Sequence, residues 1–156
     1  MLLAYNDYSS YASAKTAGII RLIDAVQAGA GTRLDIMGMQ SHVRTTSPGV
    51  ASHQTAVEAF LAEGLDVEIT ELDIHCTDDS TSGQSDLAAL YADYFNMFES
   101  LAKTGTDNGI RGVTIWGLRD SNTWLTGLYG VTSYPLLLNE WFYTKASWDA
   151  VIQAAP

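Results

Sequence analysis

The stretch VEITELDI, residues 67–74, combines the apolar pattern of a buried β-strand with three carboxylates. Two of them, Glu71 and Asp73, stand two positions apart near its end. Successive side chains of a strand point to opposite faces, so these two acids are expected to project together. Two negative charges on one face of a strand suggest a functional site, and other residues of that site are expected at the ends of the other strands.

The composition indicates one folded domain, residues 1–156, with no nucleic-acid or membrane-surface partner. The 156 residues suffice for one domain and are marginal for two, and 47% apolar with 17% charged residues is a globular balance. The net charge of -10 would repel a nucleic-acid backbone or an anionic membrane, so a neutral or cationic ligand is expected. No apolar run approaches the ~20 residues of a membrane span, and the first residues do not form a signal-peptide pattern.

Short apolar runs alternate with longer helical patterns, which predicts parallel βαβ units. Strands are predicted at residues 2–5, 34–40, 67–74 and 112–116, and helices at 14–28, 52–63, 85–103 and 146–154. The segment 119–145 is rich in Trp, Tyr, Gly and Asn. It is too long for a plain connection and is expected to carry function.

Four βα units fit either an open doubly wound sheet or part of a (β/α)8 barrel. Each predicted strand ends in binding or reactive side chains, which are Asn6 and Asp7, Gln40 and His42, Glu71 and Asp73, and Trp116. Barrel enzymes draw their catalytic residues from the carboxyl ends of several strands. No glycine-rich phosphate loop follows the first strand, as a nucleotide-binding sheet would require. The barrel is therefore favoured.

An imidazole lies on the strand before the two carboxylates. Gln40 and His42 share parity within the predicted second strand and should face one side of the sheet. If Glu71 and Asp73 face that side too, His42 could order one carboxylate as a nucleophile. A plainer alternative has both acids meeting solvent at a strand end and His42 packed in the core. Metal binding is a further alternative, but no paired ligand spacing supports it.

Four tryptophans offer surfaces for a flat ligand or bulk for the core. Trp116 at a strand end and Trp124 on the following segment could form an apolar floor under a ligand. Trp141 and Trp148 stand beside apolar neighbours and are expected to pack in the core.

The strings AYNDYS, GMQSHV, ITELDI and TIWGLRDSNTWL, in this order and at these separations, resemble the carboxy-terminal half of family 10 glycoside hydrolases, the endo-β-1,4-xylanases. The resemblance covers essentially the whole chain. It implies an α/β fold that is the second half, strands five to eight, of a (β/α)8 TIM barrel. It also implies a retaining hydrolase that acts on xylan or xylo-oligosaccharides without a cofactor or metal, in an extracellular location.

The resemblance assigns catalytic roles to three residues and a sugar contact to a fourth. Glu71 matches the nucleophile of a retaining xylanase, and Asp73 and His42 match the residues that orient it. Gln40 lies beside them at the sugar site.

Further matches are to substrate-binding residues. Trp116 and Trp124 match the aromatic walls of the glycone site, and Asn6 and Tyr8 belong to the motif after the fifth barrel strand, where the tyrosine shapes the aglycone side. Ser9 stands where the family often has a second asparagine, which leaves one contact of that motif open.

Retaining hydrolysis requires a second carboxyl group, about 5–5.5 Å from the first, as acid and then base. In the family this glutamate lies in a Trp-x-x-x-Asn-Glu type motif upstream of the matched segment. The only Asn-Glu pair here, Asn139-Glu140, falls after the last predicted strand. The expected partner is a complementary amino-terminal half-barrel that carries the acid/base glutamate. A non-catalytic carbohydrate-binding half-barrel is the alternative.

Overall fold

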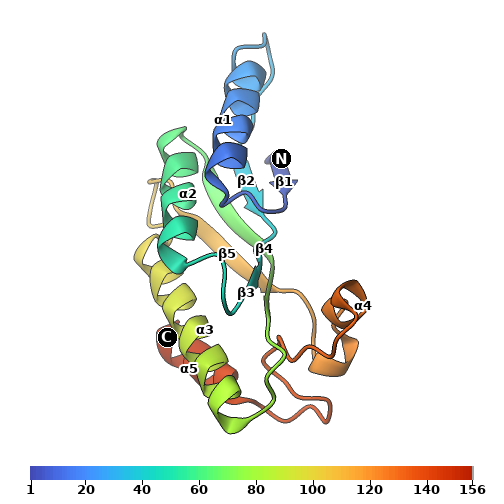
Figure 1. Ribbon diagram of the computed structural model, residues 1–156. Coiled ribbons are helices and arrows are strands. Elements are labelled where there is room, and N and C mark those ends of the chain that lie inside the picture. The colour runs from blue at the N-terminus through green and yellow to red at the C-terminus, as the bar shows by residue number, and fades with distance from the viewer. Residues whose placement is uncertain (156) are drawn as a thin grey trace. The chain divides into compact units, whose positions relative to one another are not determined.

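The computed structural model describes residues 1–155 as parallel strands alternating with helices (Figure 1). The strands are β1 (Ala4–Asp7), β2 (Ile36–Met39), β3 (His42–Arg44), β4 (Asp66–His75) and β5 (Ile110–Ile115). The helices are α1 (Ser13–Gln27), α2 (Val50–Ala62), α3 (Thr81–Ser100), α4 (Leu125–Tyr129) and α5 (Ala146–Ala154), with a 3-10 turn at Asp120–Asn122. The predicted alternation of strand and helix is confirmed.

The chain forms two compact units. Unit 1 contains Met1–Ser41, Gly49–Glu71 and Leu101–Thr114, and unit 2 contains His42–Pro48, Leu72–Ser100 and the chain from Ile115 onward. Strands β4 and β5 each contribute residues to both units.

In unit 1, β2 pairs in parallel with β1 on one side and with the first part of β4 on the other. Asn6 lies opposite Gly38, and Gly38 lies opposite Glu68. Helix α1 packs against α2 and buries Ile19 and Ile23, which are four residues apart and therefore share one helical face. Strand β2 is buried along its whole length, as expected of a parallel strand covered on both faces.

In unit 2, β3 pairs in parallel with the second part of β4, which places His42 opposite Asp73. Helix α3 packs along α5 (Figure 1). Two fully buried tyrosines of α3 keep their hydroxyls satisfied, since Tyr91 donates to the Pro135 carbonyl at 2.7 Å and Tyr94 to the Pro48 carbonyl at 3.2 Å.

The predicted strand at residues 34–40 is shorter in the structure, and His42 belongs to a separate strand. Strand β2 ends at Met39, and β3 begins at His42 after Ser41, whose φ of 63° lies in the left-handed region. The expectation that Gln40 and His42 share a side by strand parity is therefore wrong in its premise. The pairing register also changes along β4. Met39 pairs with Ile69 and His42 pairs with Asp73, so three positions on one side correspond to four on β4. An extra residue in β4 is a bulge, where simple alternation of side chains does not hold.

Two tryptophans predicted in the core lie at the surface instead. Trp141 is 70% exposed and Trp148 38% exposed, while Leu136 and Val151 supply buried apolar side chains in this region. Strand β1 begins two residues later than predicted, so Asn6 and Asp7 belong to the strand itself. Within residues 1–155, no helix is both long and apolar enough to cross a bilayer.

Candidate active site

Asp73 carries a fully buried carboxylate in unit 2. The residue is 0% exposed, and its two oxygens face two ring N–H groups. Trp124 donates its Nε1 proton to Oδ2 at 2.8 Å, and His42 Nδ1 lies 2.9 Å from Oδ1. The alternative in which Asp73 is a solvated strand end is therefore wrong.

The pairing with Asp73 fixes the state of the His42 ring. An ionised carboxylate only accepts hydrogen bonds, so Nδ1 must carry the proton in this contact. When the ring is neutral, Nε2 is then the acceptor nitrogen. The Trp124 ring meets the His42 ring edge-on, at 4.8 Å between centroids and 65° between planes, which restricts the imidazole further. Asp73 and Trp124 together hold His42 in one tautomer and one orientation.

Glu71 lies in a polar cluster of unit 1 with Asn6 and Thr70. Asn6 Nδ2 donates to Glu71 Oε1 at 3.2 Å, and Thr70 Oγ1 donates to Asn6 Oδ1 at 2.8 Å. The threonine hydroxyl thereby orients the carboxamide with its NH2 group toward the glutamate. Gly38 makes room for this arrangement, because a Cβ on it would lie 2.8 Å from Asn6 Oδ1.

Tyr8 presents a flat ring that is supported from one face. The Lys15 ammonium lies 3.5 Å from the ring centroid, and the residue remains 61% exposed. Lys15 in turn bonds Asp7 at 2.7 Å, and Asp7 also accepts from the Tyr5 hydroxyl at 2.8 Å. Burial opposes ionisation of Asp7, but the hydrogen bonds from Lys15 and Tyr5 outweigh it and lower the pKa of that carboxyl. The pKa of Tyr5 is raised, chiefly by its hydrogen bond to Asp7.

The remaining predicted site residues are solvent-accessible. Trp116 and Trp124 are 45% and 42% exposed in unit 2, and Gln40 is half-buried in unit 1. The backbone N–H of Gln40 donates to the Asp7 carbonyl at 3.1 Å, which ties the Gln40 backbone to the end of β1.

The structure brings the predicted residues together in two groups, each within its own unit. Glu71 and Asn6 are in contact in unit 1, and Asp73, His42 and Trp124 are in contact in unit 2. The shared direction of Glu71 and Asp73 stays a prediction.

Sequence reasoning missed three supporting contacts. Thr70 orients Asn6, Lys15 supports Tyr8, and the Trp124 indole bonds Asp73. Only the contact of Thr70 with Asn6 had a signal in the sequence. A glycine inside a predicted strand often marks a close approach by a neighbour, and the Asn6 side chain lies against Gly38.

A metal centre finds no ligand set in the described chain. Among residues 1–155, no three side chains of the His, Cys, Asp and Glu types gather closely enough to hold an ion. His75, a residue type that often binds metals, bonds the Ser133 hydroxyl at 2.8 Å and packs on Tyr129 with 4.3 Å between ring centroids.

Known proteins of similar sequence and fold are xylanases. Endo-1,4-beta-xylanase B of Butyrivibrio fibrisolvens is 37% identical over 158 residues, covering 98% of this chain and 24% of that protein. A family 10 (GH10) xylanase of Thermobacillus composti has 30% identity and a TM-score of 0.87, covering 99% of this chain and 52% of that one. A mutant of xylanase 10C from Cellvibrio japonicus, solved in complex with xylopentaose, has 27% identity and a TM-score of 0.84, covering 99% and 34%.

The chain thus spans about a quarter of the first relative and no more than about half of the two solved chains. Its fold is an α/β fold with a parallel sheet, similar to the TIM-barrel xylanases of family 10. The model of the family described as "Glycosyl hydrolase family 10" matches residues 1–154. The chain belongs to glycosyl hydrolase family 10.

Proposed function

We propose that residues 1–156 form one segment, the carboxy-terminal half of a (β/α)8 catalytic domain, and that this half bears the nucleophile of a retaining endo-β-1,4-xylanase. Four βα units are half of the eight in a whole barrel, which needs about 250 residues. The proposed partner is an amino-terminal half-barrel that supplies the acid/base glutamate. The proposed substrate is xylan or a xylo-oligosaccharide. Similar proteins support this choice, because one is named an endo-1,4-beta-xylanase and another was solved in complex with xylopentaose. The proposed location is extracellular.

In the proposed mechanism Glu71 attacks the anomeric carbon as a carboxylate and forms a glycosyl-enzyme ester. The acid/base carboxyl of the partner half protonates the departing glycosidic oxygen, then removes a proton from the water that hydrolyses the ester. Asp73 fixes His42 through the Nδ1 proton, and His42 orients Glu71 by donating the proton that its other ring nitrogen carries in the imidazolium form, in which both ring nitrogens are donors. Asp73 and His42 are positioning residues in this scheme, because neither touches the reacting atoms.

Substrate binding is assigned to the exposed aromatic and amide side chains. Trp116 and Trp124 form the walls of the glycone site, and Gln40 bonds a sugar hydroxyl. Asn6 contacts both the nucleophile and the sugar, and Tyr8 supports the aglycone side. A ring held from behind by a lysine ammonium, as Tyr8 is, keeps one face for a sugar.

The observation that carries the proposal is the buried Asp73 carboxylate with its two N–H donors, in a chain that belongs to this family. Burying a charge is costly unless it is paired and hydrogen-bonded. A fully buried carboxylate is therefore expected where it has hydrogen-bond partners or a functional role. Here it holds a histidine in one tautomer, two residues along the strand from Glu71.

The test is hydrolysis by a reconstituted barrel, made from this chain and the amino-terminal half-barrel of a family 10 relative. Glu71→Gln should lower the rate on xylan at least about a thousandfold, since a nucleophile contributes several kcal/mol to catalysis. Glu68→Gln is the matched control, because Glu68 is also a half-buried glutamate of β4 and has no proposed role. Full hydrolysis after Glu71→Gln would refute the role given to Glu71.

A non-catalytic carbohydrate-binding half-barrel is the second candidate. It is favoured by the exposure of Tyr8, Trp116 and Trp124, and by the absence of an acid/base motif from this chain. The discriminating observation is whether the reading frame, or a second chain of the natural sample, carries the first four βα units with that motif. If neither does and the chain still binds xylan, the binding role is the better description.

A further inference from the structure

Unit 2 contains a cavity of about 720 Å³ that none of the proposed catalytic or substrate-binding residues lines. Its volume falls in the range of about 300–1,000 Å³ that is usual for small-molecule sites. The lining comes from the loop after β4, the first turn of α3, the segment around α4, and the loop before α5, and includes Asp79, Gln84, Thr126, Asn139, Trp141 and Lys145. Trp124 belongs to the same long segment but contributes nothing to this lining.

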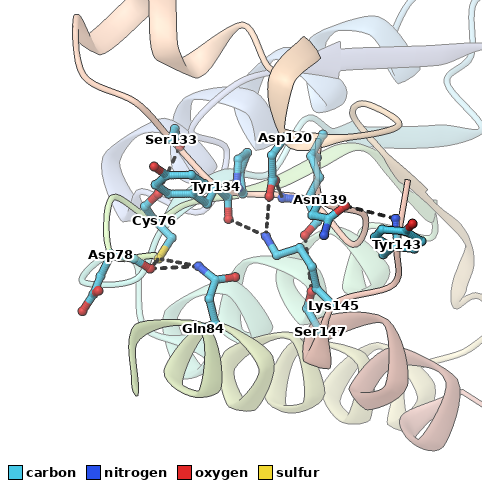
Figure 2. A network of polar contacts seen from close by, with 12 residues as sticks. Cys76, Asp78, Gln84, Asp120, Ser133, Tyr134, Asn139, Tyr143, Lys145 and Ser147 are labelled. Carbon is cyan, nitrogen blue, oxygen red and sulfur yellow. Dashed lines mark hydrogen bonds and ion pairs between the residues drawn. The ribbon is translucent and has the colours of Figure 1, made fainter. Parts of the chain in front are cut away.

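The two most buried charged side chains of the lining form an ion pair. Lys145 Nζ lies 2.8 Å from Asp120 Oδ2 and also donates to the Tyr134 carbonyl at 2.9 Å (Figure 2). Both charged side chains are largely buried, with 10% and 7% exposure. Asp120 is fixed further by the Leu136 amide at 2.9 Å. An ion pair satisfied in this way shapes the cavity without attracting an ion of either sign.

The loop that carries Trp141 is held in a fixed shape. Asn139 Oδ1 accepts from the amides of Trp141 at 2.9 Å and Tyr143 at 3.0 Å, and Leu138 bridges Thr144 across the base of the loop (Figure 2 shows the bond between Asn139 and Tyr143). The Trp141 ring is therefore an exposed aromatic surface with little freedom left in its backbone.

A second set of contacts braces the same loop from the side. Phe142 adopts a left-handed φ of 65°, and the Arg119 guanidinium lies 4.4 Å from its ring centroid. Arg119 also donates to the Glu140 carbonyl at 3.0 Å. A residue outside the loop thus fixes the two positions on either side of Trp141.

A carboxamide and several hydroxyls also line the cavity. Gln84 Nε2 donates to the Asp78 carbonyl at 2.8 Å (Figure 2), while its Oε1 is buried with no hydrogen-bond partner among residues 1–155. A buried acceptor left without a donor costs about 1–3 kcal/mol, and a hydroxyl that reached it would recover that energy. The hydroxyls of Ser121, Thr126 and Thr132 add uncharged donors and acceptors to the lining.

We propose that this cavity is a second carbohydrate site, separate from the catalytic residues, which binds a neutral pyranose unit of an oligosaccharide. Trp141 stacks on the sugar face, and the Gln84 and Asn139 carboxamides bond its hydroxyls. The carboxylates of Asp79 and Glu140 in the lining, with a net charge of -10 on the chain, disfavour anionic sugars. The choice of xylose as the sugar rests on the proposed function.

The test is an NMR titration of the chain with xylotetraose, following the four tryptophan indole N–H resonances after each has been assigned by a Trp→Phe variant. The Trp141 resonance should shift along a saturating curve. Trp141→Ala should weaken that binding about tenfold or more, as judged from neighbouring amide resonances, since losing a stacked aromatic contact commonly costs more than 1 kcal/mol. Tyr143→Ala should change it less than about twofold.

Tyr143 is a matched control, because it lies in the same loop, is equally exposed at 70%, and does not line the cavity. A Trp141 resonance that does not move, or equal losses in Trp141→Ala and Tyr143→Ala, would overturn the proposal. The Trp124 resonance reports the proposed glycone site independently. If Trp124 responds and Trp141 does not, this second site fails and the proposed function stands. If Trp141 responds while a Glu71→Gln barrel keeps full activity, the second site stands and the proposed function fails.

Discussion

Replacing Asp73 with asparagine removes one charge and changes almost no volume. The wild-type carboxylate accepts from His42 Nδ1 and from Trp124 Nε1. An asparagine offers one acceptor oxygen and one NH2 group, so it can accept from only one of these two donors. If it keeps the Trp124 bond, His42 must move its proton to Nε2 so that Nδ1 can accept from the new NH2 group.

The size of the effect follows from the burial of the site. Hydrogen bonds to a charged group contribute about 1.5–3 kcal/mol each and neutral ones about 0.5–1.5 kcal/mol. Asp73 is fully buried, so solvent screens these bonds little. Two charge-assisted bonds become two neutral ones, partly offset by the easier burial of an uncharged side chain. We expect the free energy of unfolding to fall by about 2 kcal/mol, and single-turnover cleavage by the reconstituted barrel to slow about ten- to a thousandfold.

Urea denaturation of the chain measures the change in stability. The midpoint of the unfolding transition should fall, while m, the slope of the unfolding free energy against urea concentration, should stay unchanged. Nitrogen chemical shifts of the His42 ring report directly which ring nitrogens carry protons, and Nδ1 should be protonated in the wild type and unprotonated in Asp73→Asn. Asp93→Asn is the control, because Asp93 is an exposed aspartate of α3 and its replacement should change stability by less than about 0.5 kcal/mol. Equal stability losses in the two variants, with an unchanged tautomer, would refute this reasoning.

Three further predictions concern other parts of the molecule. Gly38→Ala should destabilise the chain by about 1–3 kcal/mol, since the added Cβ meets Asn6, whereas Gly112→Ala on β5 meets no atom within 4 Å and should be neutral; urea midpoints decide this. Burial lowers the pKa of His53 from 6.5 to about 4, so the unfolded chain binds the extra proton first and stability should fall as the pH drops from 6.5 toward 4. His53→Gln should show a smaller fall over the same window. The reconstituted barrel should have a bell-shaped pH–rate profile, because one carboxyl must be ionised and the other protonated; a rate that rises steadily with pH would contradict the two-carboxylate mechanism.

The helices and most strands were predictable because periodicity is a local property of the sequence. The closing helix at 146–154 matches its predicted bounds, and α1 is displaced by one residue. The break between β2 and β3 was not predictable, because it depends on a serine at position 41 in a conformation that glycine, asparagine or aspartate usually adopts. The extra residue in β4 leaves no local signal either, since a bulge appears only when the pairing is known.

The candidate site was predictable in its residue types and only partly in its contacts. The contact between His42 and Asp73 follows from adjacent strand ends, which the order of the chain supplies. The bond from Trp124 to Asp73 depends on the path of the segment after β5, and no pattern in that segment specifies the path. Trp141 was misplaced for a related reason, because its apolar neighbours suggested a core position while the Asn139 side chain turns the loop outward.

Trapping of the covalent intermediate tests the role of Glu71 most directly. The reconstituted barrel would be incubated with a 2-fluoro xylobioside bearing a good leaving group, digested, and mapped by mass spectrometry, because a retaining enzyme must pass through a glycosyl-enzyme ester. We predict one added disaccharide mass, on the peptide that contains Glu71 and absent from the Glu71→Gln variant. A label on any other residue, or hydrolysis of xylan by a barrel that never acquires a label, would contradict the assignment of Glu71 as the nucleophile.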